Sequence, residues 1–358
     1  MEALSRKRFA VGNLEEEYEP ICELGKGGFG SVVKARHRVT GQLVAIKRLA
    51  DPGECQSEVM REKRFLEACS GNPFVVGFRG VVRAPDSMEL RLVMDHVGPS
   101  LRDFLRLRRA EDPPLPEPTV RAIMWQLLQG AKRMHTVHVV HRDIKPDNLL
   151  VSADQNLVKI CDLGLALHMC DAPPYERAGT TWYMAPEVVL GKPDYDALVD
   201  AWSLGCVMAE LINGEVLFFP GDNNNGSEAC QQIRAIIDVL GVPDGKAWPW
   251  FSTTPFATGV LPRLRHRQRR SLLRHKFPAT VLSQQGFEVL SGLLTWNPDK
   301  RLTASAALKH PWFDDLNAPT ALPARNKEDL PSALPNMKHP RTMISPNLLH
   351  KRRKIQCA

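Results

Sequence analysis

The sequence predicts an α+β fold in which a smaller, strand-rich part precedes a larger, mainly helical part. Residues 18–95 contain short runs rich in β-branched side chains, whereas the patterns after residue 100 have the apolar spacing of helices. The chain has 358 residues. At roughly 150 residues per domain, that length predicts two to three structural units with sizeable cores.

The composition excludes several classes of protein. Hydrophobic residues make up 43% and charged residues 24% of the chain, which excludes a wholly disordered or fibrous protein. No apolar run approaches the roughly 18 residues of a membrane span, and the charged N-terminus leads into no signal-peptide core. The eight cysteines are scattered singly, which fits neither a disulfide framework nor a zinc site. We therefore expect a soluble protein of a reducing, intracellular compartment.

The charge balance is mildly basic, with 47 Lys and Arg against 40 Asp and Glu and a formal net charge of +7. This excess suits acidic partners, and it equally suits a basic protein that has no such partner. Basic clusters lie at residues 263–270 and 351–354. The first fits a solvated insertion, and the second fits a nuclear localisation signal or a solvated tail. Because aromatic interleaving and nucleic-acid fold motifs are missing from the sequence, we expect no direct nucleic-acid binding.

The elements can be assigned in chain order. Residues 1–17 end in three glutamates and are expected to form a mobile N-terminal arm. Strands are predicted at 31–37 and 42–49, and helices at 56–69, 117–138, 200–213, 228–240 and 285–296. In residues 314–358 prolines recur and no period survives, so we expect a disordered, Pro-containing basic tail.

Residues 25–30 read GKGGFG, a GxGxxG pattern that is weak by itself. In a dinucleotide-binding fold a helix would follow it. Here the strand-like run 31–37 follows instead. A glycine loop between two strands is a flap whose backbone can close over a triphosphate, because no side chains intervene.

A lysine in the next strand has a candidate partner. Alternation places Ala45 and Lys47 on one face of that strand. A strand lysine is usually at the surface. Glu62, however, shares an apolar helical stripe with Val59 and Leu66, where an acid is costly unless it is paired. Lys47 is a suitable partner.

The second cluster is more specific. One loop between two apolar runs carries Asp143, Lys145 and Asn148, and Asp162 follows the second run. Phosphoryl transfer needs a carboxylate that orients a hydroxyl, hard oxygen ligands for magnesium, and cations on the phosphates. A lone loop aspartate would indicate only a turn. Together with Lys47, the whole set predicts phosphoryl transfer.

These motifs, in this order, resemble those of the eukaryotic protein kinases. The matching segments are the glycine loop at 25–30, VAIK at 44–47, HRD at 141–143, DLG at 162–164 and APE at 185–187. The resemblance covers residues 18–313. It implies a two-lobed fold with ATP in the cleft, a β-rich N-lobe with one regulatory helix at 18–96 and a mainly helical C-lobe at 97–313.

The resemblance also implies a role for each site residue. Asp143 would be the catalytic base, Lys145 would stabilise the phosphate, and Thr180 would bridge the two. Asn148 and Asp162 would be ligands of Mg²⁺. Glu62 would position Lys47. The residues expected to bind ATP are Leu24, Gly25, Lys26, Gly27, Gly28, Phe29, Gly30, Ser31, Val32, Ala45, Lys47, Met94, Asp95, Val97 and Leu150.

Within the kinases, the chain resembles the cyclin-dependent-kinase-like Ser/Thr kinases of the CMGC group, in particular divergent members from plants. The segments that carry this likeness are 199–206, 219–222, 240–244 and 297–301. It implies a buried ion pair between Glu187 and Arg301. We expect an ATP- and magnesium-dependent kinase with protein substrates and a role in cell-cycle or transcription-related signalling, located in the nucleus and/or cytoplasm.

Several departures leave parts of this analogy open. Residues 56–62 keep only Ser57, Arg61 and Glu62 of the cyclin-contacting motif, so the need for a cyclin-type subunit stays open. Met184 replaces an arginine that favours proline after the target residue, so proline direction is open too. Leu163 replaces the phenylalanine of DFG but stays apolar, which we do not interpret as inactivating.

The activation loop departs as well. Tyr175 occupies the usual position of the phosphorylated threonine. Two of the three arginines that would hold the phosphate remain, Arg61 and Arg142, while the third position is Leu167. We predict activity without loop phosphorylation, with Glu176 neutralising the two arginines; phosphorylation of Tyr175 is the alternative.

A different class of function is a pseudokinase that acts as a scaffold for partner proteins. In a pseudokinase we would expect another residue in place of Lys47, Asp143, Asn148 or Asp162, and all four are present here. The sequence therefore favours an enzyme.

Overall fold

The computed structural model describes residues 11–27, 30–49, 55–85, 89–107, 114–221, 226–263 and 270–317. The chain divides into two units, residues 1–318 and 319–358, and the described residues all belong to the first. The expected tail from residue 318 onward and the basic run at 264–269 lie outside the described residues.

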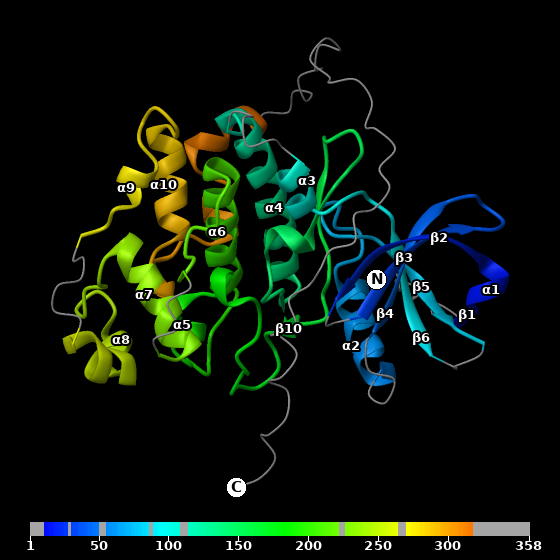
Figure 1. Cartoon of the computed structure of the whole chain (residues 1–358), viewed down its shortest axis with the longest axis horizontal. Helices are drawn as coiled ribbons and strands as arrows, with labels where there is room; N and C mark the ends of the chain where they lie inside the picture. Colours follow the sequence, from blue (N-terminus) through cyan, green and yellow to red (C-terminus); the bar gives the residue numbers. More distant parts are fainter. Residues whose placement is uncertain are drawn as a thin grey trace, which may run out of the picture. The chain divides into compact units, whose positions relative to one another are not determined.

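The strand-rich part is one six-stranded sheet in the order β1-β5-β6-β4-β3-β2 (Figure 1). Its strands are β1 Val11–Asn13, β2 Tyr18–Gly27, β3 Gly30–His37, β4 Leu43–Leu49, β5 Phe78–Arg83 and β6 Leu90–Asp95. All neighbours pair antiparallel except β1 and β5, which are parallel. The helix α2, Cys55–Ala68, packs against β5 and β6. The predicted strands and helix are present, within one residue of their expected ends.

The prediction of an N-terminal arm is wrong for residues 11–17. Val11–Asn13 forms the edge strand β1, and Leu14–Glu17 forms the single helical turn α1, capped by the Asn13 side chain. The charged run of glutamates gave no sign of this, because a three-residue edge strand is too short to show a period. Residues 1–10 lie outside the described residues.

Side chains alternate along β4, so that one face of the sheet packs into a hydrophobic cluster and the other faces a cavity. Val44 and Ile46 are buried in a small cluster with Ala35 and Val93 on one face. Lys47, on the other face, points toward the cavity described below, as the alternating pattern predicted.

The larger part is mainly helical. Its helices are α3 Leu101–Leu107, α4 Glu117–Thr136, α5 Pro186–Val189, α6 Leu198–Asn213, α7 Glu228–Leu240, α8 Pro249–Thr253, α9 Leu273–Lys276, α10 Gln284–Leu293, α11 Ala304–Ala307 and α12 Asp314–Asn317. Four short strands accompany them: β7 Val139–Val140, β8 Leu149–Val151, β9 Val158–Ile160 and β10 Leu167–His168. The short helix α12 begins where the sequence predicted the tail.

The predicted long helices are present, with shifts at their ends. The bounds of α7 match the prediction, and α6 begins two residues earlier than predicted. α4 ends at Thr136 because His138 adopts a left-handed backbone conformation, with φ +60°. α10 ends at Leu293 rather than Trp296. Among the described residues, no helix combines the length and apolar character needed to cross a membrane.

One hydrophobic cluster joins the sheet part to the helical part. It contains side chains from α2, β5 and β6 as well as from α4, α6 and α10. The backbone ties the parts together too, since Val76 N donates to Ile160 O and Ile160 N donates to Phe74 O, both at 2.8 Å. The fold is therefore the two-lobed α+β arrangement that the resemblance implied.

Candidate active site

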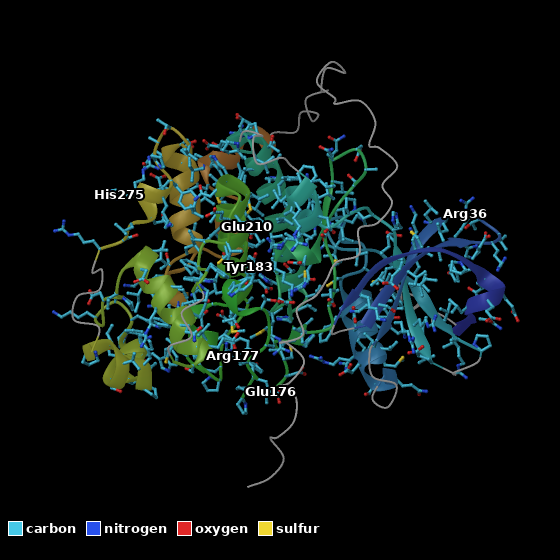
Figure 2. The ribbon with its side chains drawn as sticks, viewed as in Figure 1. Arg36, Glu176, Arg177, Tyr183, Glu210 and His275 are labelled. Carbon is cyan, nitrogen blue, oxygen red and sulfur yellow. The ribbon has the colours of Figure 1, made fainter. Side chains whose placement is uncertain are left out.

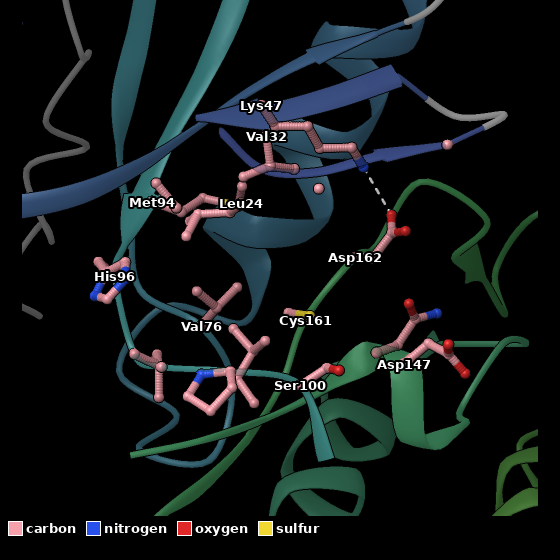
Figure 3. Close-up of a pocket in the computed structure, with 18 of the residues that line it drawn as sticks. Leu24, Val32, Lys47, Val76, Met94, His96, Ser100, Asp147, Cys161 and Asp162 are labelled. Atoms are coloured by element: carbon pink, nitrogen blue, oxygen red, sulfur yellow. Dashed lines mark hydrogen bonds and ion pairs between the residues drawn. The ribbon is translucent and has the colours of Figure 1, made fainter. Parts of the chain in front are cut away.

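A cavity of about 690 Å³ lies between the β2–β3 turn and the loops that follow α4 (Figure 3). Of the residues expected to bind ATP, all that are described line it: Leu24, Gly25, Lys26, Gly27, Gly30, Ser31, Val32, Ala45, Lys47, Met94, Asp95, Val97 and Leu150. Gly28 and Phe29 lie outside the described residues. The volume and the mostly apolar walls fit a ligand of the size of a nucleotide.

The glycine turn is built as the flap interpretation requires. β2 and β3 pair up to Gly27 opposite Gly30, so a strand and not a helix follows the turn. Gly30 has φ +127°, and a Cβ there would lie 1.8 Å from the carbonyl oxygen of Arg48. Only glycine fits this position, which brings backbone rather than side chains to the roof of the cavity.

Lys47 connects α2 to the floor of the cavity. Its Nζ donates to both carboxylate oxygens of Glu62, at 2.7 and 2.8 Å, and to Oδ1 of Asp162 at 2.7 Å. Glu62 is buried, so the lone acid on the apolar stripe does have the partner that the sequence predicted. Figure 3 shows Lys47 reaching down from its strand to Asp162.

Lys47 and Asp162 are each shifted toward their ionised forms, whereas burial raises the pKa of Glu62. Burial alone would lower the pKa of Lys47, but the charges of Glu62 and Asp162 outweigh burial and raise it. Burial likewise opposes ionisation of Asp162, yet the Lys47 ammonium holds the pKa of that carboxyl below its usual range. The site thus presents a fixed cation beside a fixed anion.

Asp143 is held by four donors. Its Oδ1 accepts from Thr180 N at 2.8 Å and from Thr180 Oγ1 at 2.7 Å. Its Oδ2 accepts from Lys145 Nζ at 2.8 Å and from Asn148 Nδ2 at 3.0 Å. Lys145 also donates to Thr180 Oγ1 at 2.6 Å, so Thr180 does bridge the two residues. These bonds fix the carboxylate next to the cavity that Asn148 lines.

Asn148 and Asp162 offer the donor chemistry that Mg²⁺ prefers. The Asn148 amide nitrogen is used by Asp143, which leaves its amide oxygen to face a cation. Asp162 gives Oδ1 to Lys47, and its Oδ2 is the oxygen available for a metal. Both residues line the cavity, so this pair of hard oxygen donors fits a magnesium ion bound together with phosphates.

A family model described as a protein kinase domain matches residues 18–313. The chain belongs to the protein kinase family.

Its relatives refine this placement. It is 43% identical over 318 residues to the putative cyclin-dependent kinase F-2 of Oryza sativa subsp. japonica, covering 85% of this chain and 92% of that protein. It is 35% identical over 335 residues to cyclin-dependent kinase G1 of Arabidopsis thaliana, covering 89% of this chain but 52% of that protein. It is also 34% identical over 318 residues to extracellular signal-regulated kinase 2 of Dictyostelium discoideum, covering 86% of this chain and 82% of that protein. The chain is a cyclin-dependent-kinase-like Ser/Thr protein kinase, similar to those of plants.

A carboxylate of α6 anchors the catalytic loop of the kinase. Asp200 is buried and accepts from the backbone nitrogens of His141 and Arg142 and from His135 Nε2, each at 2.9 Å. These bonds hold Arg142 with φ +68°, an uncommon conformation for a residue with a side chain. Asp200 lies 57 positions from Asp143, and sequence reasoning assigned it no role.

Several other residues of the cavity were also missed. Val76, His96, Asp147 and Cys161 line it, as Figure 3 shows. Burial, and then the Lys34 charge, lower the pKa of His96, so the imidazole is neutral at neutral pH. Burial strongly raises the pKa of the Cys161 thiol, which keeps it protonated. No periodic pattern or residue spacing in the sequence assigns these residues to the cavity.

The activation segment is held differently from the prediction. Arg142 donates to the carbonyl of Leu165 at 2.6 Å and to the hydroxyl of Tyr195 at 2.9 Å, while Tyr195 donates to the carbonyl of Glu176 at 2.6 Å. The Glu176 side chain is exposed, and in the part of the chain that the structure describes no ion pair joins it to either arginine. The prediction that the Glu176 carboxylate neutralises the arginines is therefore wrong; its backbone carbonyl takes part instead. Figure 2 labels Glu176 at the periphery.

The two arginines do share one region, as predicted. Burial and the charge of Arg142 lower the pKa of Arg61. Arg61 donates to the carbonyls of Gly164 and Ala166, at 3.0 and 2.7 Å. Neutral carbonyl and hydroxyl oxygens thus satisfy both guanidinium groups.

The expected brace of the segment is present. Arg301 is bidentate to Glu187, with N–O distances of 2.7 and 2.8 Å, and both side chains are almost fully buried. Arg301 also donates to the carbonyls of Leu198, Thr295 and Trp296, so all parts of its guanidinium are satisfied.

Proposed function

We propose that this kinase transfers the γ-phosphate of ATP to a hydroxyl of a protein substrate in signalling related to the cell cycle or transcription. The observation that supports catalysis is the Asp143 carboxylate, held by four donors beside a nucleotide-sized cavity. Such positioning and electrostatic stabilisation make up most of what phosphoryl transfer asks of a protein.

In the proposed reaction, Asp143 accepts a hydrogen bond from the substrate hydroxyl and takes its proton as the hydroxyl oxygen attacks the γ-phosphorus of ATP. The bond between that phosphorus and the bridging oxygen breaks, and ADP leaves. In the structure all four lone-pair positions of this carboxylate are used. Lys145 is the donor able to turn away toward a phosphate, since Thr180 remains to hold the carboxylate. Lys47 then holds the other phosphates, positioned by Glu62.

Magnesium bound by Asn148 and Asp162 would neutralise charge on the phosphates. ATP and magnesium are the cofactors expected of the family.

The experiment is phosphorylation of a peptide library with γ-labelled ATP and magnesium, with and without candidate cyclins. The matched control is Asp143→Asn, which keeps the size of the side chain and one acceptor oxygen but cannot act as a base. Labelling by the wild type and not by the variant is the expected result. Equal labelling by both would contradict the role of Asp143, and no labelling of any peptide would favour the scaffold alternative.

A cyclin-type regulatory subunit is an open part of this proposal. The names of the plant relatives support it, whereas the loss of most of the cyclin-contacting motif at residues 56–62 argues against it. Location in the nucleus and/or cytoplasm is likewise proposed, on the basic run at 351–354 alone.

A further inference from the structure

Resting on the kinase activity proposed above, we propose that Arg102 fills, from within the chain, an acidic subsite that would otherwise receive an arginine of the substrate. Arg102 then acts as a specificity residue. With it in place the enzyme is indifferent to arginine near the phosphorylated residue; without it, the enzyme selects arginine.

Every part of the Arg102 guanidinium has an acceptor. Nη1 donates to Glu210 Oε1, Nη2 donates to Tyr183 Oη at 2.5 Å, and Nε donates to Asp147 Oδ2 at 3.3 Å. Tyr183 in turn donates to Glu210 Oε2 at 2.6 Å. Two carboxylates and a phenol oxygen thus surround one planar cation, which is the arrangement that recognises arginine rather than lysine.

The acids of this subsite differ in burial. The Glu210 side chain is 2% exposed and lies in the last turn of α6, whereas the Asp147 side chain is 50% exposed at the rim of the cavity. Figure 2 shows Tyr183 and Glu210 together in the interior. The charges of Glu210 and Asp147, together with the Tyr183 phenol, outweigh the effect of burial and raise the pKa of Arg102. Loss of the guanidinium would leave a buried carboxylate without its cation.

The subsite adjoins the place where a substrate must bind. Asp147 belongs to the same loop as Asp143 and lines the ATP cavity. Tyr183 follows Thr180 by three residues, and Thr180 is bonded to Asp143. Both segments therefore border the place where a peptide would present its hydroxyl to Asp143, and we infer that an arginine near that hydroxyl could enter the subsite between them.

The test replaces Arg102 by Ala and presents fluorescent peptides in which a single arginine is moved through the positions on either side of the acceptor serine. Binding is measured by anisotropy and phosphorylation by KM. For the wild type we expect Kd and KM to change little along the series. For Arg102→Ala we expect one position at which arginine lowers both by roughly tenfold to a hundredfold, as for hydrogen bonds to a charged group, and lysine to do less.

Two controls isolate the subsite. Arg106 is an exposed arginine on the same helix, α3, and Arg106→Ala should behave as the wild type. In the double variant Arg102→Ala, Glu210→Gln, the gain from arginine should be lost. Should Arg102→Ala fail to fold, Arg102→Gln, which keeps a long side chain without the charge, takes its place in the same series.

Guanidinium ion gives a readout that needs no activity. At about 10 mM it should raise the melting temperature of Arg102→Ala but not that of the wild type, with methylammonium as the matched salt. If the variant binds no peptide of the series more tightly than the wild type does, the subsite is refuted. If no protein phosphorylates any peptide, the proposed function fails, while the anisotropy series still decides on the subsite.

Discussion

At the scale of single residues, the two aspartates of the site differ in the groups that hydrogen-bond to their carboxylates. Asp143 is held by uncharged donors and by Lys145, whereas Asp162 is held mainly by Lys47. We predict that Asp143→Asn and Asp162→Asn each lower kcat by about 10³-fold or more while the fold stays intact, since the first removes the base and the second a carboxylate ligand of magnesium. Circular dichroism checks that each variant is folded, and transfer from labelled ATP measures the rate. Folded Asp162→Asn that works at the wild-type rate would show the assigned magnesium role to be wrong.

The Lys47–Glu62 pair leads to a second prediction. Lys47→Met should depress turnover strongly because it removes the phosphate-binding cation, and Glu62→Gln should do so because the lysine loses its bidentate partner. The stability effects should differ. Glu62→Gln leaves Lys47 with Asp162, while Lys47→Met strands a buried carboxylate and should cost about 3–5 kcal/mol unless Glu62 takes up a proton.

Urea unfolding at pH 7 and pH 5 measures this difference. The loss of unfolding free energy caused by Lys47→Met should be smaller at pH 5 than at pH 7. Burial raises the pKa of Glu62, so this carboxylate takes up a proton more readily at pH 5. A crystal structure with Mg-ATP in which Glu62 points to solvent while activity stays high would contradict the coupling.

At the scale of elements, a tyrosine hydroxyl holds the activation segment, whereas the sequence predicted that the Glu176 carboxylate would do so. The Tyr195 hydroxyl links Arg142 to the carbonyl of Glu176, and its ring meets Tyr175 edge-on at a centroid distance of 5.4 Å. The Tyr175 hydroxyl donates to the carbonyl of Asp171. The segment is therefore ordered without added charge.

We predict that phosphatase-treated protein and Tyr175→Phe keep most of their activity. Because only the backbone of Glu176 takes part, Glu176→Gln should also be active. Tyr195→Phe should lose activity several-fold, since without the hydroxyl Arg142 holds the Glu176 carbonyl only through its longer, 3.4 Å bond and fixes the segment less firmly. Steady-state kinetics on the three variants tests this. Loss of activity after phosphatase treatment, restored by a kinase acting on residues 165–181, would be the opposite result.

The helix α6 sets the catalytic loop through one carboxylate, with a consequence for acid stability. Burial opposes ionisation of Asp200, but the hydrogen bond and charge of His135 hold its pKa below the ordinary 3.8. A lowered pKa stabilises the folded state above the unfolded-state value, and the contribution fades as the pH falls through the folded-state value.

Asp200→Asn should therefore destabilise the kinase by about 3–5 kcal/mol at pH 7. The gap between the variant and the wild type should close as the pH falls below about 4. Urea midpoints at a series of pH values measure it. A gap that stays constant through this range would mean that the ionised carboxylate is not what anchors the loop.

At the scale of the whole molecule, some contacts can be predicted from the sequence and others cannot. Lys47 and Glu62 could be paired because strand alternation and a helical stripe each leave a periodic trace, and the catalytic loop could be found because its residues are close in sequence. Asp200, Tyr195 and Arg102 act through a few bonds to residues far away in the sequence, and such bonds leave no periodic pattern.

The shared core makes a prediction about unfolding. Because one hydrophobic cluster includes both the sheet part and the helical part, we expect the two to unfold in a single cooperative transition. The seven tryptophans all lie beyond residue 124, so their fluorescence reports mainly on the helical part, while circular dichroism reports on the whole chain. The two thermal curves should coincide.

A matched pair of glycines tests the connection. A Cβ at Gly130 would lie 3.1 Å from Ile160 and from Phe74, where the two parts are joined. Gly130→Val should therefore cost about 1–3 kcal/mol and shift both curves together. Gly80, in β5, has open space around its Cβ position, so Gly80→Ala should shift both curves little. An early circular-dichroism transition in Gly130→Val, with the fluorescence curve unmoved, would show that the sheet part unfolds on its own and that the common core does not couple the lobes.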